Sequence, residues 1–381
     1  TATHARLAET LGEEAISGEG SEAALVEALQ KQGVPLWEKT PSGQLATNKF
    51  ALQEFVDDHP CIEDLFAWRT ATKFLSTYLD PMVDRDVVHP SFRQIGAWTG
   101  RMSCARPNMQ NIPVRAGAEV RAMFVPRPGY AFVVCDYDSI EVRLLAHYLG
   151  DTSFRQLIAD GHDPHSWMAA NLHGGSPEDY AKGGPNDSVR AAAKNSLFAI
   201  TYGAGGKRIT DMNQLDPGPF YGEDHPAIQA AQAEGRWWPK VGWQYAEGRA
   251  LIRKIKASLP NYDRLMKRIR AKIEDVGYVN TLWGRTNPVN KDKSYVGLNA
   301  LIQGSAADVM KQGLVLVAEA VAPLGGVPLL VVHDEVVVEV PIDQAEECLE
   351  ATKAALVQAY DLDPPLAVTG TITYTNYSDV K

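Results

Sequence analysis

The sequence predicts an α+β fold, in which helices and an antiparallel sheet occupy separate stretches of the chain. Residues 130–136 (YAFVVCD) are rich in β-branched and aromatic side chains, which is typical of a buried strand. The last third predicts a helix over 298–320, two strands around a turn over 328–341, a helix over 345–360 and a strand over 366–374. This order of elements does not follow the strand–helix–strand repeat of a parallel sheet.

The first 85 residues are predicted to form a small helical lobe. Residues 21–33 (SEAALVEALQKQG) have helical apolar spacing, with Ser21 as the N-cap and Gly33 as the stop. A turn at residues 41–43 (PSG) is followed by helical spacing over 48–80.

The Pro-, Asn- and Arg-rich stretch 101–125 is too polar for a core element. A short helix is predicted over 141–149, ending at Gly150, and residues 151–290 predict helices broken by Gly and Pro clusters.

Length and composition exclude some classes of protein. The 381 residues exceed a single core of about 150 residues, so two or three lobes are expected. No apolar run approaches the ~18 residues that cross a bilayer, so no membrane partner is expected. The start of the chain, residues 1–20, is mixed and acidic, unlike a secretory signal. Because it also lacks an initiator Met, we expect the chain to be a piece of something longer.

The cysteines predict a reducing compartment. None of the four belongs to a Cys-x-x-Cys pair, so we expect free thiols in a cytosolic protein without a zinc knuckle. They are Cys61, Cys104, Cys135 and Cys348.

The charge balance is acidic overall but basic in two stretches. The net charge is 37 − 47 = −10, which taken alone argues against a nucleic-acid-binding protein. Residues 101–127, however, hold five arginines and one glutamate, and residues 236–272 hold eleven Lys or Arg and two acids. Such a run is either a solvated helix face or a surface for a phosphate backbone, and the charges alone leave both interpretations open.

Two acidic positions follow strand-like runs. Asp136 comes directly after five apolar residues, and His333, Asp334 and Glu335 interrupt two valine-rich runs, which is the pattern of a tight hairpin turn. Each Asp taken alone is equally well explained as a turn residue whose side chain hydrogen-bonds to the nearby backbone. Together they suggest one sheet that presents two carboxylates at neighbouring strand ends. Such a pair suits Mg²⁺, which prefers oxygen ligands, and a two-metal phosphoryl transfer.

The helix predicted over residues 187–203 carries a distinctive stripe. Asp187 or Ser188 would cap it and Gly203 would end it. Arg190, Lys194, Phe198 and Tyr202 are four residues apart and so share one face, roughly 18 Å long. The two cations suit a polyphosphate and the two rings suit a base or sugar. An amphipathic helix with core aromatics and solvated cations is the alternative interpretation.

Several motifs together resemble family A DNA polymerases. Residues 136–143 (DYDSIEVR) resemble the first polymerase motif of that family, DYSQIELR; residues 190–203 resemble R-x-x-x-K-x-x-x-F-x-x-x-Y-G; and residues 332–335 are its VHDE. Further matches, in the family's order, are 99–113 to TGRLSS…PNLQNIP, 163–165 to D-I-H, 277–285 to GYVETLxGR and 299–308 to NAPMQGTAAD. The resemblance covers about residues 35–381.

The resemblance implies a right-hand polymerase fold with an antiparallel-sheet palm, helical fingers and a short helical thumb. It assigns residues 1–85 to a thumb-like lobe, 86–150 to the first part of the palm, 151–290 to the fingers and 291–381 to the second part of the palm. The front lobe leaves no room for a 3′–5′ exonuclease domain, so we expect no proofreading in this chain. The partners implied are primer–template DNA and deoxynucleoside triphosphates, and we expect a monomer in the cytoplasm of a bacterial or phage-infected cell, associated with the nucleoid.

The resemblance also assigns roles to residues of this sequence. Asp136 and Asp334 would hold two Mg²⁺ ions, replaceable by Mn²⁺, with the Tyr137 carbonyl as a further ligand and Glu335 beside them. Contacts to the incoming nucleotide would come from Arg190, Lys194, Phe198, Tyr202, His165, Glu141 and Ser139. Within that set, Lys194 would also give a proton to the departing pyrophosphate. Contacts to primer or template would come from Arg101, Asn108, Gln110, Asn299, Gln303, His333 and Arg285.

Two of these positions predict substrate choice. The family uses a Glu at the position of Glu141 to crowd a ribose 2′-hydroxyl, whereas single-subunit RNA polymerases carry a small residue there. Glu141 therefore favours DNA synthesis over the alternative of an RNA-synthesising relative. Phe198, where some relatives carry Tyr, predicts discrimination against dideoxynucleotides. A non-catalytic DNA-binding descendant is a further alternative. The presence of both Asp136 and Asp334 argues against it, because loss of either would have supported it.

The sequence departs from the family pattern at a few positions. Asp138 and Ser139 replace a Ser and a Gln, and the Gln usually joins a hydrogen-bond network near the new base pair. Ala199 replaces a Gly after Phe198, and Tyr295 stands where many relatives have an Arg. These changes put the fidelity of synthesis and the sensing of the minor groove in question.

Overall fold

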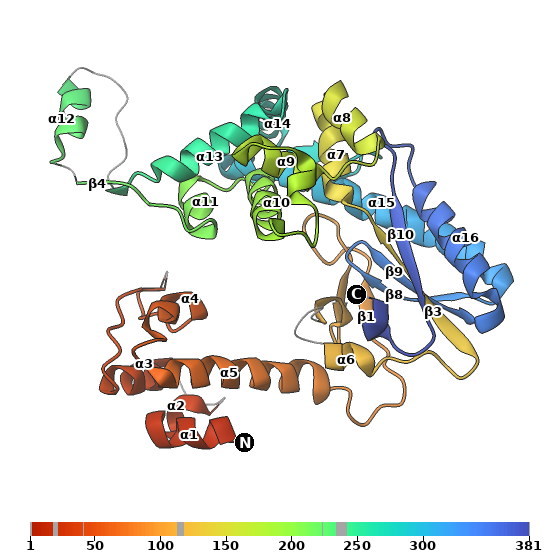
Figure 1. Cartoon of the computed structure of the whole chain (residues 1–381), viewed down its shortest axis with the longest axis horizontal. Coiled ribbons are helices and arrows are strands. Elements are labelled where there is room, and N and C mark those ends of the chain that lie inside the picture. Colours follow the sequence, from red (N-terminus) through yellow and green to blue (C-terminus); the bar gives the residue numbers. More distant parts are fainter. Residues whose placement is uncertain are drawn as a thin grey trace. The chain divides into compact units, whose positions relative to one another are not determined.

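The computed structural model describes residues 2–17, 22–40, 42–112, 118–222, 224–233 and 242–380 (Figure 1). The chain forms two compact units. The first comprises Thr1–Ser91 with Ala105–Asn108, and the second comprises Phe92–Cys104 with Met109–Lys381. No helix in the described ranges is long and apolar enough to cross a membrane.

The first unit is helical, as predicted for the front lobe. Its main helices are α1 (Ala2–Leu11), α2 (Glu13–Ile16), α3 (Glu22–Lys31), α4 (Lys49–Leu52) and α5 (Pro60–Phe74). Their buried core includes Leu7, Leu29, Leu52, Ile62 and Leu65. The end of α3 agrees with the expected stop, because Gly33 lies two residues beyond it with a left-handed φ of 81°. The predicted cap Ser21 and the turn residue Pro41 lie outside the described residues.

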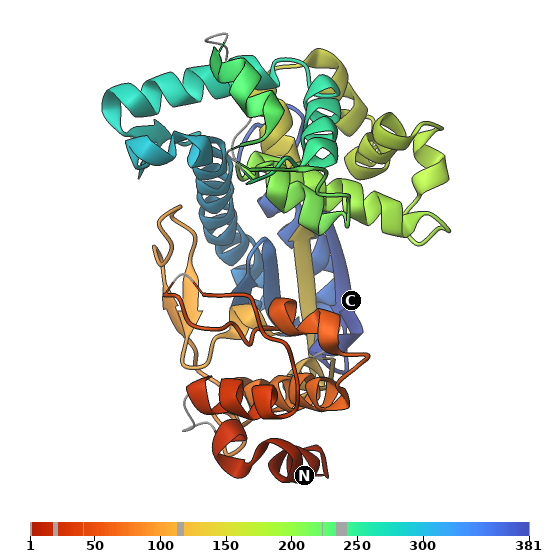
Figure 2. The same cartoon turned by 90° about the vertical axis from the view of Figure 1, so that its left-hand side faces the viewer.

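A four-stranded antiparallel sheet organises the second unit, and its strand order is β10–β3–β9–β8. The strands are β3 (Tyr130–Tyr137), β8 (Val327–Val332), β9 (Glu335–Pro341) and β10 (Val368–Thr373). The predicted hairpin is therefore β8–β9, and Figure 2 shows the same strands turned by 90°. The central pairing sets Asp136 of β3 directly opposite Glu335 of β9 and next to Thr369 of β10.

The two faces of this sheet bury different sets of side chains, because side chains alternate along a strand. Val133, Cys135, Val336 and Val338 belong to the main core, together with helices α7 (Ile140–Leu149), α15 (Gly297–Val321) and α16 (Ala345–Val357). Residues Phe132, Val134 and Val337 point the other way and pack with Tyr377 near the C-terminus. Asp136 and Glu335 continue this second alternation, so they lie on the sheet face that α15 and α16 leave open.

The middle of the chain is helical, as the sequence predicts. Its helices are α8 (Thr152–Ala159), α9 (Pro164–His173), α10 (Asp187–Thr201), α11 (Gly206–Met212), α12 (Pro226–Ala233), α13 (Ala246–Ala257) and α14 (Tyr262–Val276). The predicted cap of α10, Asp187 or Ser188, is wrong by one or two residues. Asn186 occupies the N-cap position, so Asp187 and Ser188 are already helical. At that end of the helix the Asp187 carboxylate lies 3.8 Å from the Arg190 guanidinium.

The stretch 101–125, predicted to be irregular, contains short elements. They are β2 (Ser103–Ala105), a 3₁₀ turn (Met109–Asn111) and α6 (Ala118–Ala122). Pro113 and Arg115 of the predicted motif and basic stretch lie outside the described residues. The remaining short strands are β1 (Ser91–Arg93), β4 (Phe220–Tyr221), β5 (Gly242–Trp243), β6 (Tyr278–Asn280) and β7 (Thr286–Pro288).

Candidate active site

The two candidate carboxylates meet at one end of the sheet. A tight turn, His333–Asp334, joins β8 to β9, and His333 adopts the left-handed φ of 58° that such a turn requires. The Tyr137 N–H donates to the Asp334 carbonyl at 3.2 Å, which ties the end of β3 to this turn. Asp136 and Asp334, which are 334 − 136 = 198 residues apart in sequence, thus lie at adjacent strand ends.

The electrostatics of the turn agree with this proximity. Burial raises the pKa of the Asp334 carboxyl above its ordinary range, and the negative charge of Asp136 raises it further. Glu335, 1% exposed, accepts a hydrogen bond from the Tyr377 hydroxyl. Burial also lowers the pKa of His333, with Arg101 as the next cause. Two close carboxylates of which one resists ionisation are a set of donors that a divalent cation would stabilise.

The carboxylate oxygens of Asp136 and Asp334 are donors that suit a hard divalent cation. Among the described residues, no group of three or more His, Cys, Asp and Glu side chains is arranged to hold a metal ion. Mg²⁺ is usually bound by one or two carboxylates and completes its shell with water and substrate phosphates. The Tyr137 side chain is committed elsewhere, because its hydroxyl donates to the Leu356 carbonyl at 2.7 Å in the core. The main-chain carbonyl is the part of Tyr137 that remains for ligation.

Helix α10 presents its predicted stripe to the same cavity. Arg190, Lys194, Phe198 and Tyr202 all line it, together with Asp136 and Asp334, and the cavity has a volume of about 1270 Å³. The Lys194 Nζ lies 5.9 Å from the Phe198 ring centroid, and the Phe198 and Tyr202 rings are 6.2 Å apart. The cations and the aromatic rings are therefore ordered along the helix as its periodicity predicts.

Arg190 is held in place by an acid from the neighbouring helix. Its Nε lies 2.5 Å from an Asp163 carboxylate oxygen, and Asp163 also caps α9 through the His165 N–H at 3.0 Å. Burial alone would raise the pKa of Asp163, but hydrogen bonds from Arg190, Ser166 and the His165 N–H lower it to about 2. The Arg190 guanidinium is thus held at the cavity wall by a partner that is ionised at neutral pH.

His165 is buried beside this pair. It is 1% exposed, its ring lies 5.8 Å from the Phe198 ring, and neither ring nitrogen has a hydrogen-bond partner among the described residues. Burial lowers the pKa of His165 to about 4; Asp163 opposes this shift, and Lys194 and Arg190 add to it. The imidazole is therefore neutral at pH 7 and can donate or accept one hydrogen bond without adding charge.

This burial predicts a pH dependence of stability. The folded pKa of His165, about 4, lies below its ordinary value of 6.5, so the unfolded chain binds the extra proton between those two values. The contribution of neutral His165 to the free energy of unfolding is then present above pH 6.5 and is lost as the pH drops toward 4. Between pH 7 and pH 5 the parent should lose about 2 kcal/mol more than His165→Gln, as measured by urea unfolding. The exposed His173→Gln serves as the control, and an identical pH response in parent and His165→Gln would refute the assignment.

A hydrogen-bonded group surrounds Glu141 at the start of α7. The Tyr202 hydroxyl donates to one of its carboxylate oxygens and the Arg101 guanidinium donates to the other. The side chain of Gln303 also hydrogen-bonds to Tyr202. Burial and the Glu141 charge raise the pKa of the Tyr202 hydroxyl, which therefore stays protonated as a donor. Glu141 is consequently fixed at the cavity wall from both sides.

Ser139 precedes this helix in an unusual conformation. Its φ of 53° is left-handed, which is uncommon for a residue other than glycine and is often retained at functional sites. The neighbouring departure from the family pattern, Asp138, accepts a hydrogen bond from the Thr369 hydroxyl at 3.0 Å. Both residues line the 1270 Å³ cavity, so neither departure is remote from it.

The residues predicted to contact DNA are not all equally available. Arg101 and His333 line the large cavity, whereas Gln110 is largely buried and donates to the Val331 carbonyl at 3.2 Å. Arg285 donates to Asp308, Asn287 and the carbonyls of Thr99 and Gly304. Its guanidinium therefore joins the segment before Arg101 to α15, and its role at DNA stays a prediction.

Two further predicted DNA contacts are placed differently. Asn299 lies in the first turn of α15, and its Oδ1 is buried without a hydrogen-bond partner in the described part of the chain. Asn108 belongs to the first compact unit, whereas the other predicted site residues belong to the second.

The cavity is also lined by residues that the sequence analysis did not identify as functional. Lys182 lines it from the loop before α10, and Thr369, Gly370 and Thr371 line it from β10. The sequence signal for Lys182 was weak: a single cation before Gly183 and Gly184, in a segment predicted as a loop. The β10 residues come from a strand with no charged side chain, which periodicity identifies only as a strand.

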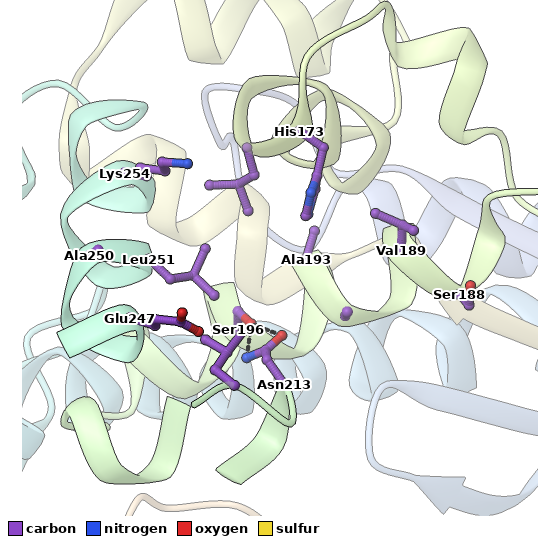
Figure 3. Close-up of a pocket in the computed structure, with 13 residues that line it drawn as sticks. His173, Ser188, Val189, Ala193, Ser196, Asn213, Glu247, Ala250, Leu251 and Lys254 are labelled. Atoms are coloured by element: carbon purple, nitrogen blue, oxygen red, sulfur yellow. Dashed lines mark hydrogen bonds between the residues drawn. The ribbon is translucent and has the colours of Figure 1, made fainter. Parts of the chain in front are cut away.

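The opposite face of α10 borders a second cavity (Figure 3). It has a volume of about 500 Å³ and lies between α10 and the α13 residues Ala250, Leu251 and Lys254. Its polar edge includes Ser196 and Asn213, which hydrogen-bond to each other at 3.0 Å. Part of the α10 face away from the stripe therefore borders this cavity, although Ala193 and Ser196 on that face are buried.

Known proteins of one family resemble this chain over most of its length. The family model for DNA polymerase family A matches residues 3–219 and 231–379. The thermostable DNA polymerase I of Thermus filiformis is 33% identical over 353 residues, covering 88% of this chain and 38% of that protein. The DNA polymerase I of Deinococcus radiodurans is 32% identical over 344 residues, covering 86% of this chain and 32% of that protein.

A solved structure gives the same result. The polymerase domain of Pol1 from M. smegmatis, in complex with a DNA primer–template and a dNTP, matches with a TM-score of 0.79 and 25% identity, covering 100% of this chain and 66% of that chain. The predicted α+β fold of right-hand polymerase type is therefore confirmed.

The fold and the match across most of the chain define a polymerase-type domain. The chain belongs to DNA polymerase family A, as the motifs predict. It spans between about a third and two fifths of the length of the curated relatives described above. Members of this family generally use divalent metal ions.

Proposed function

We propose that the chain is a template-directed DNA polymerase that adds deoxynucleotides to a primer 3′-hydroxyl and releases pyrophosphate. The observation that carries the proposal is the shared cavity, in which the carboxylates of Asp136 and Asp334 line one side and the stripe of α10 lines another. A phosphoryl transfer between two nucleotides needs this combination, because charge must be neutralised at the attacking oxygen and on the leaving pyrophosphate.

Asp136, Asp334 and the Tyr137 carbonyl would hold two Mg²⁺ ions, for which Mn²⁺ can substitute, and Glu335 would support them. When bound, the metals would lower the pKa of the primer hydroxyl and would neutralise charge on the triphosphate. The raised pKa of Asp334 supports this assignment, since a buried like-charge pair is relieved by a cation.

The stripe of α10 would bind the triphosphate. Arg190 would grip it as a fork and Lys194 as a point charge, with neutral His165 giving one further hydrogen bond. The primer hydroxyl would lose its proton to water, and the bond between its oxygen and the α-phosphorus would form as the bond from that phosphorus to the bridging oxygen breaks. Lys194 would then donate a proton to the departing pyrophosphate.

The remaining cavity residues would shape the nucleotide site. Phe198 would pack on the sugar and Tyr202 would border the template side of the new pair. Glu141 would exclude a ribose 2′-hydroxyl, and its two hydrogen-bond donors support a fixed position for it. Ser139 would lie near the nascent pair, where its short side chain reaches less far than the Gln of relatives. DNA contacts would come from Arg101, Asn108, Gln110, Asn299, Gln303, His333 and Arg285.

Basic side chains of α13 and α14 would contact the DNA backbone. Helix α14 buries Leu265, Ile269 and Ile273 and exposes its cations on the other faces, which by itself fits either a solvated face or a DNA-binding surface. Lys267 and Arg270 are the best candidates, because both line a cavity of about 450 Å³ beside Tyr295 and the end of α10. Arg236 and Lys240 of the predicted basic stretch lie outside the described residues.

Salt dependence tests this surface. Binding to a primer–template should weaken in Lys267→Gln and in Arg270→Gln, and the slope of log K against log salt should fall by about one for each cation removed. The matched control is Lys353→Gln on α16, where Lys353 is paired with Glu350 at 3.0 Å. Fluorescence anisotropy at four salt concentrations gives the slopes. Slopes equal to that of the parent would leave α14 as a solvated face.

Within the proposal, residues 1–85 form the thumb, 86–150 and 291–381 the palm, and 151–290 the fingers. The enzyme would act as a monomer on the DNA of a bacterial or phage-infected cell, in the cytoplasm at the nucleoid. The activity proposed for this chain is synthesis without excision of mismatched primer ends.

A primer-extension assay separates this function from its alternatives. Purified protein, primer–template and Mg²⁺ are incubated with deoxynucleotides or with ribonucleotides. Template-encoded extension with deoxynucleotides alone is expected. Equal use of ribonucleotides would favour an RNA-synthesising relative, and DNA binding without extension would favour a non-catalytic descendant.

A further inference from the structure

The C-terminal turn of the chain packs against the sheet face that carries the carboxylates. This turn is a 3₁₀ helix, η8 (Tyr377–Val380), and Tyr377 is buried at 3% exposure against Phe132, Val134 and Val337. The main chain fixes it as well, because the Tyr377 N–H donates to the Phe124 carbonyl at 2.9 Å. The position of the Tyr377 ring is therefore set by the sheet and by the loop after α6.

From this position the Tyr377 hydroxyl reaches the carboxylate cluster. It donates to Oε1 of Glu335, which is itself 1% exposed. Glu335 is directly paired with Asp136 across β3 and β9 and follows Asp334 in sequence. A hydrogen bond to a buried carboxylate restricts the torsions of that side chain, and a charged acceptor makes the bond stronger than a neutral one. The contact therefore fixes the orientation of Glu335 beside the two aspartates.

A buried cation backs the same ring. The Arg121 guanidinium lies 4.5 Å from the Tyr377 ring centroid, and Arg121 is 3% exposed. Its Nε and Nη1 are buried and have no hydrogen-bond partner in the described part of the chain. An arginine that is desolvated over an aromatic face holds that face in place and adds positive charge near the acids. Arg121, Tyr377 and Glu335 thus form a chain of contacts from α6 to the turn between β8 and β9.

We propose that Tyr377 is a positioning residue of the polymerase site, which fixes Glu335 next to Asp136 and Asp334 and is itself held by Arg121. The C-terminal turn then belongs to the active site, although it contributes no group to the reacting atoms. This inference rests on the proposed function. The alternative is that Tyr377 merely fills the sheet surface, in which case its hydroxyl is irrelevant to the rate.

The first test removes only the hydroxyl. Tyr377→Phe should reduce kcat for single-nucleotide incorporation about tenfold, the expected effect of losing one hydrogen bond to a buried charge. The KM for the deoxynucleotide should change less than twofold. Tyr374→Phe is the matched control, because Tyr374 is 53% exposed on the same segment, and its kinetics should equal those of the parent. An unchanged kcat in Tyr377→Phe would overturn the proposal.

A double-mutant cycle distinguishes positioning from packing. In a Glu335→Ala background, Tyr377→Phe should change kcat less than twofold, because the acceptor has already been removed. A tenfold loss that persists in this background would mean that Tyr377 acts by another route and would overturn the proposal. The same four proteins are unfolded in urea. If the two substitutions are coupled in their effect on the urea midpoint but not in their effect on kcat, the contact stabilises the fold without positioning Glu335 for catalysis, and the proposal is overturned.

The two proposals fail in different ways. A parent protein that does not extend a primer would overturn the proposed function and this inference with it, while the urea cycle would still report the Tyr377–Glu335 contact. An active parent whose kcat is insensitive to Tyr377→Phe would overturn this inference alone. Arg121→Met provides the last arm. A smaller loss of kcat than in Tyr377→Phe supports a role of Arg121 that is indirect and acts through the Tyr377 ring. A larger loss than in Tyr377→Phe contradicts that role.

Discussion

Replacing Asp136 with asparagine is expected to reduce primer extension by about a thousandfold, because the substitution removes one of the two charges that would bind the metals. The change is nearly isosteric and lies at a strand end, so the pairing of β3 with β9 should persist. Several kcal/mol of charge stabilisation at the transferring phosphoryl group would depend on this carboxylate, and each 1.36 kcal/mol is about tenfold in rate. Single-turnover incorporation with saturating deoxynucleotide measures the loss directly.

The matched control for this substitution is Asp361→Asn, at an exposed position after α16 with no active-site contact. It should extend primers at the parental rate. Binding of primer–template by Asp136→Asn should stay within a few-fold of the parent, which separates a chemical defect from a binding defect. If Asp136→Asn retained activity within tenfold of the parent while staying folded, the assignment of the carboxylates would be wrong.

The second large effect concerns the choice of sugar. Glu141→Ala should raise the use of ribonucleotides relative to deoxynucleotides by about a hundredfold, because the substitution removes the large side chain that, in the proposed function, would crowd the 2′ position. The structure strengthens this expectation, since Tyr202 and Arg101 hold both carboxylate oxygens of Glu141 and prevent it from moving aside. The ratio of kcat/KM for the two nucleotide types, measured opposite the same template base, gives the result.

Deoxynucleotide incorporation should also fall modestly in Glu141→Ala, because the substitution leaves the Tyr202 hydroxyl without its acceptor. Glu319→Ala, at an exposed position on α15, is the control for loss of an acidic side chain and should leave the ratio unchanged. A ratio that stays at the parental value in Glu141→Ala, with normal deoxynucleotide incorporation, would contradict the proposed role.

The sequence was most informative where a pattern has a single physical solution. Three polar residues between valine runs predicted the β8–β9 hairpin, and the four-residue spacing of Arg190 to Tyr202 predicted the stripe of α10. The cap of α10 was harder, because Asn186, Asp187 and Ser188 are all good capping residues and stand in succession. No periodicity distinguishes among them, and the start of α10 is therefore known from the structure.

Contacts between distant segments were beyond the reach of the sequence pattern. The motif of Arg285 suggested a DNA contact, but its four hydrogen bonds to protein groups depend on how β7, α15 and the loop at Thr99 come together. Tyr377 was missed for the same reason. It stands in a polar terminal segment with no apolar period, and its importance arises only when η8 packs on the sheet.

The pairing of β3 with β9 also limits how this protein can change. Because successive side chains of a strand alternate between faces, inserting or deleting one residue within either strand would turn its acid toward the helix-covered side. Substitutions at the buried valines alter packing by degrees, whereas a change of strand length would remove a carboxylate from the cavity in one step. Strand length, and not only residue type, is therefore under constraint in this sheet, and a library built on this scaffold should vary composition while keeping β3 and β9 at fixed length.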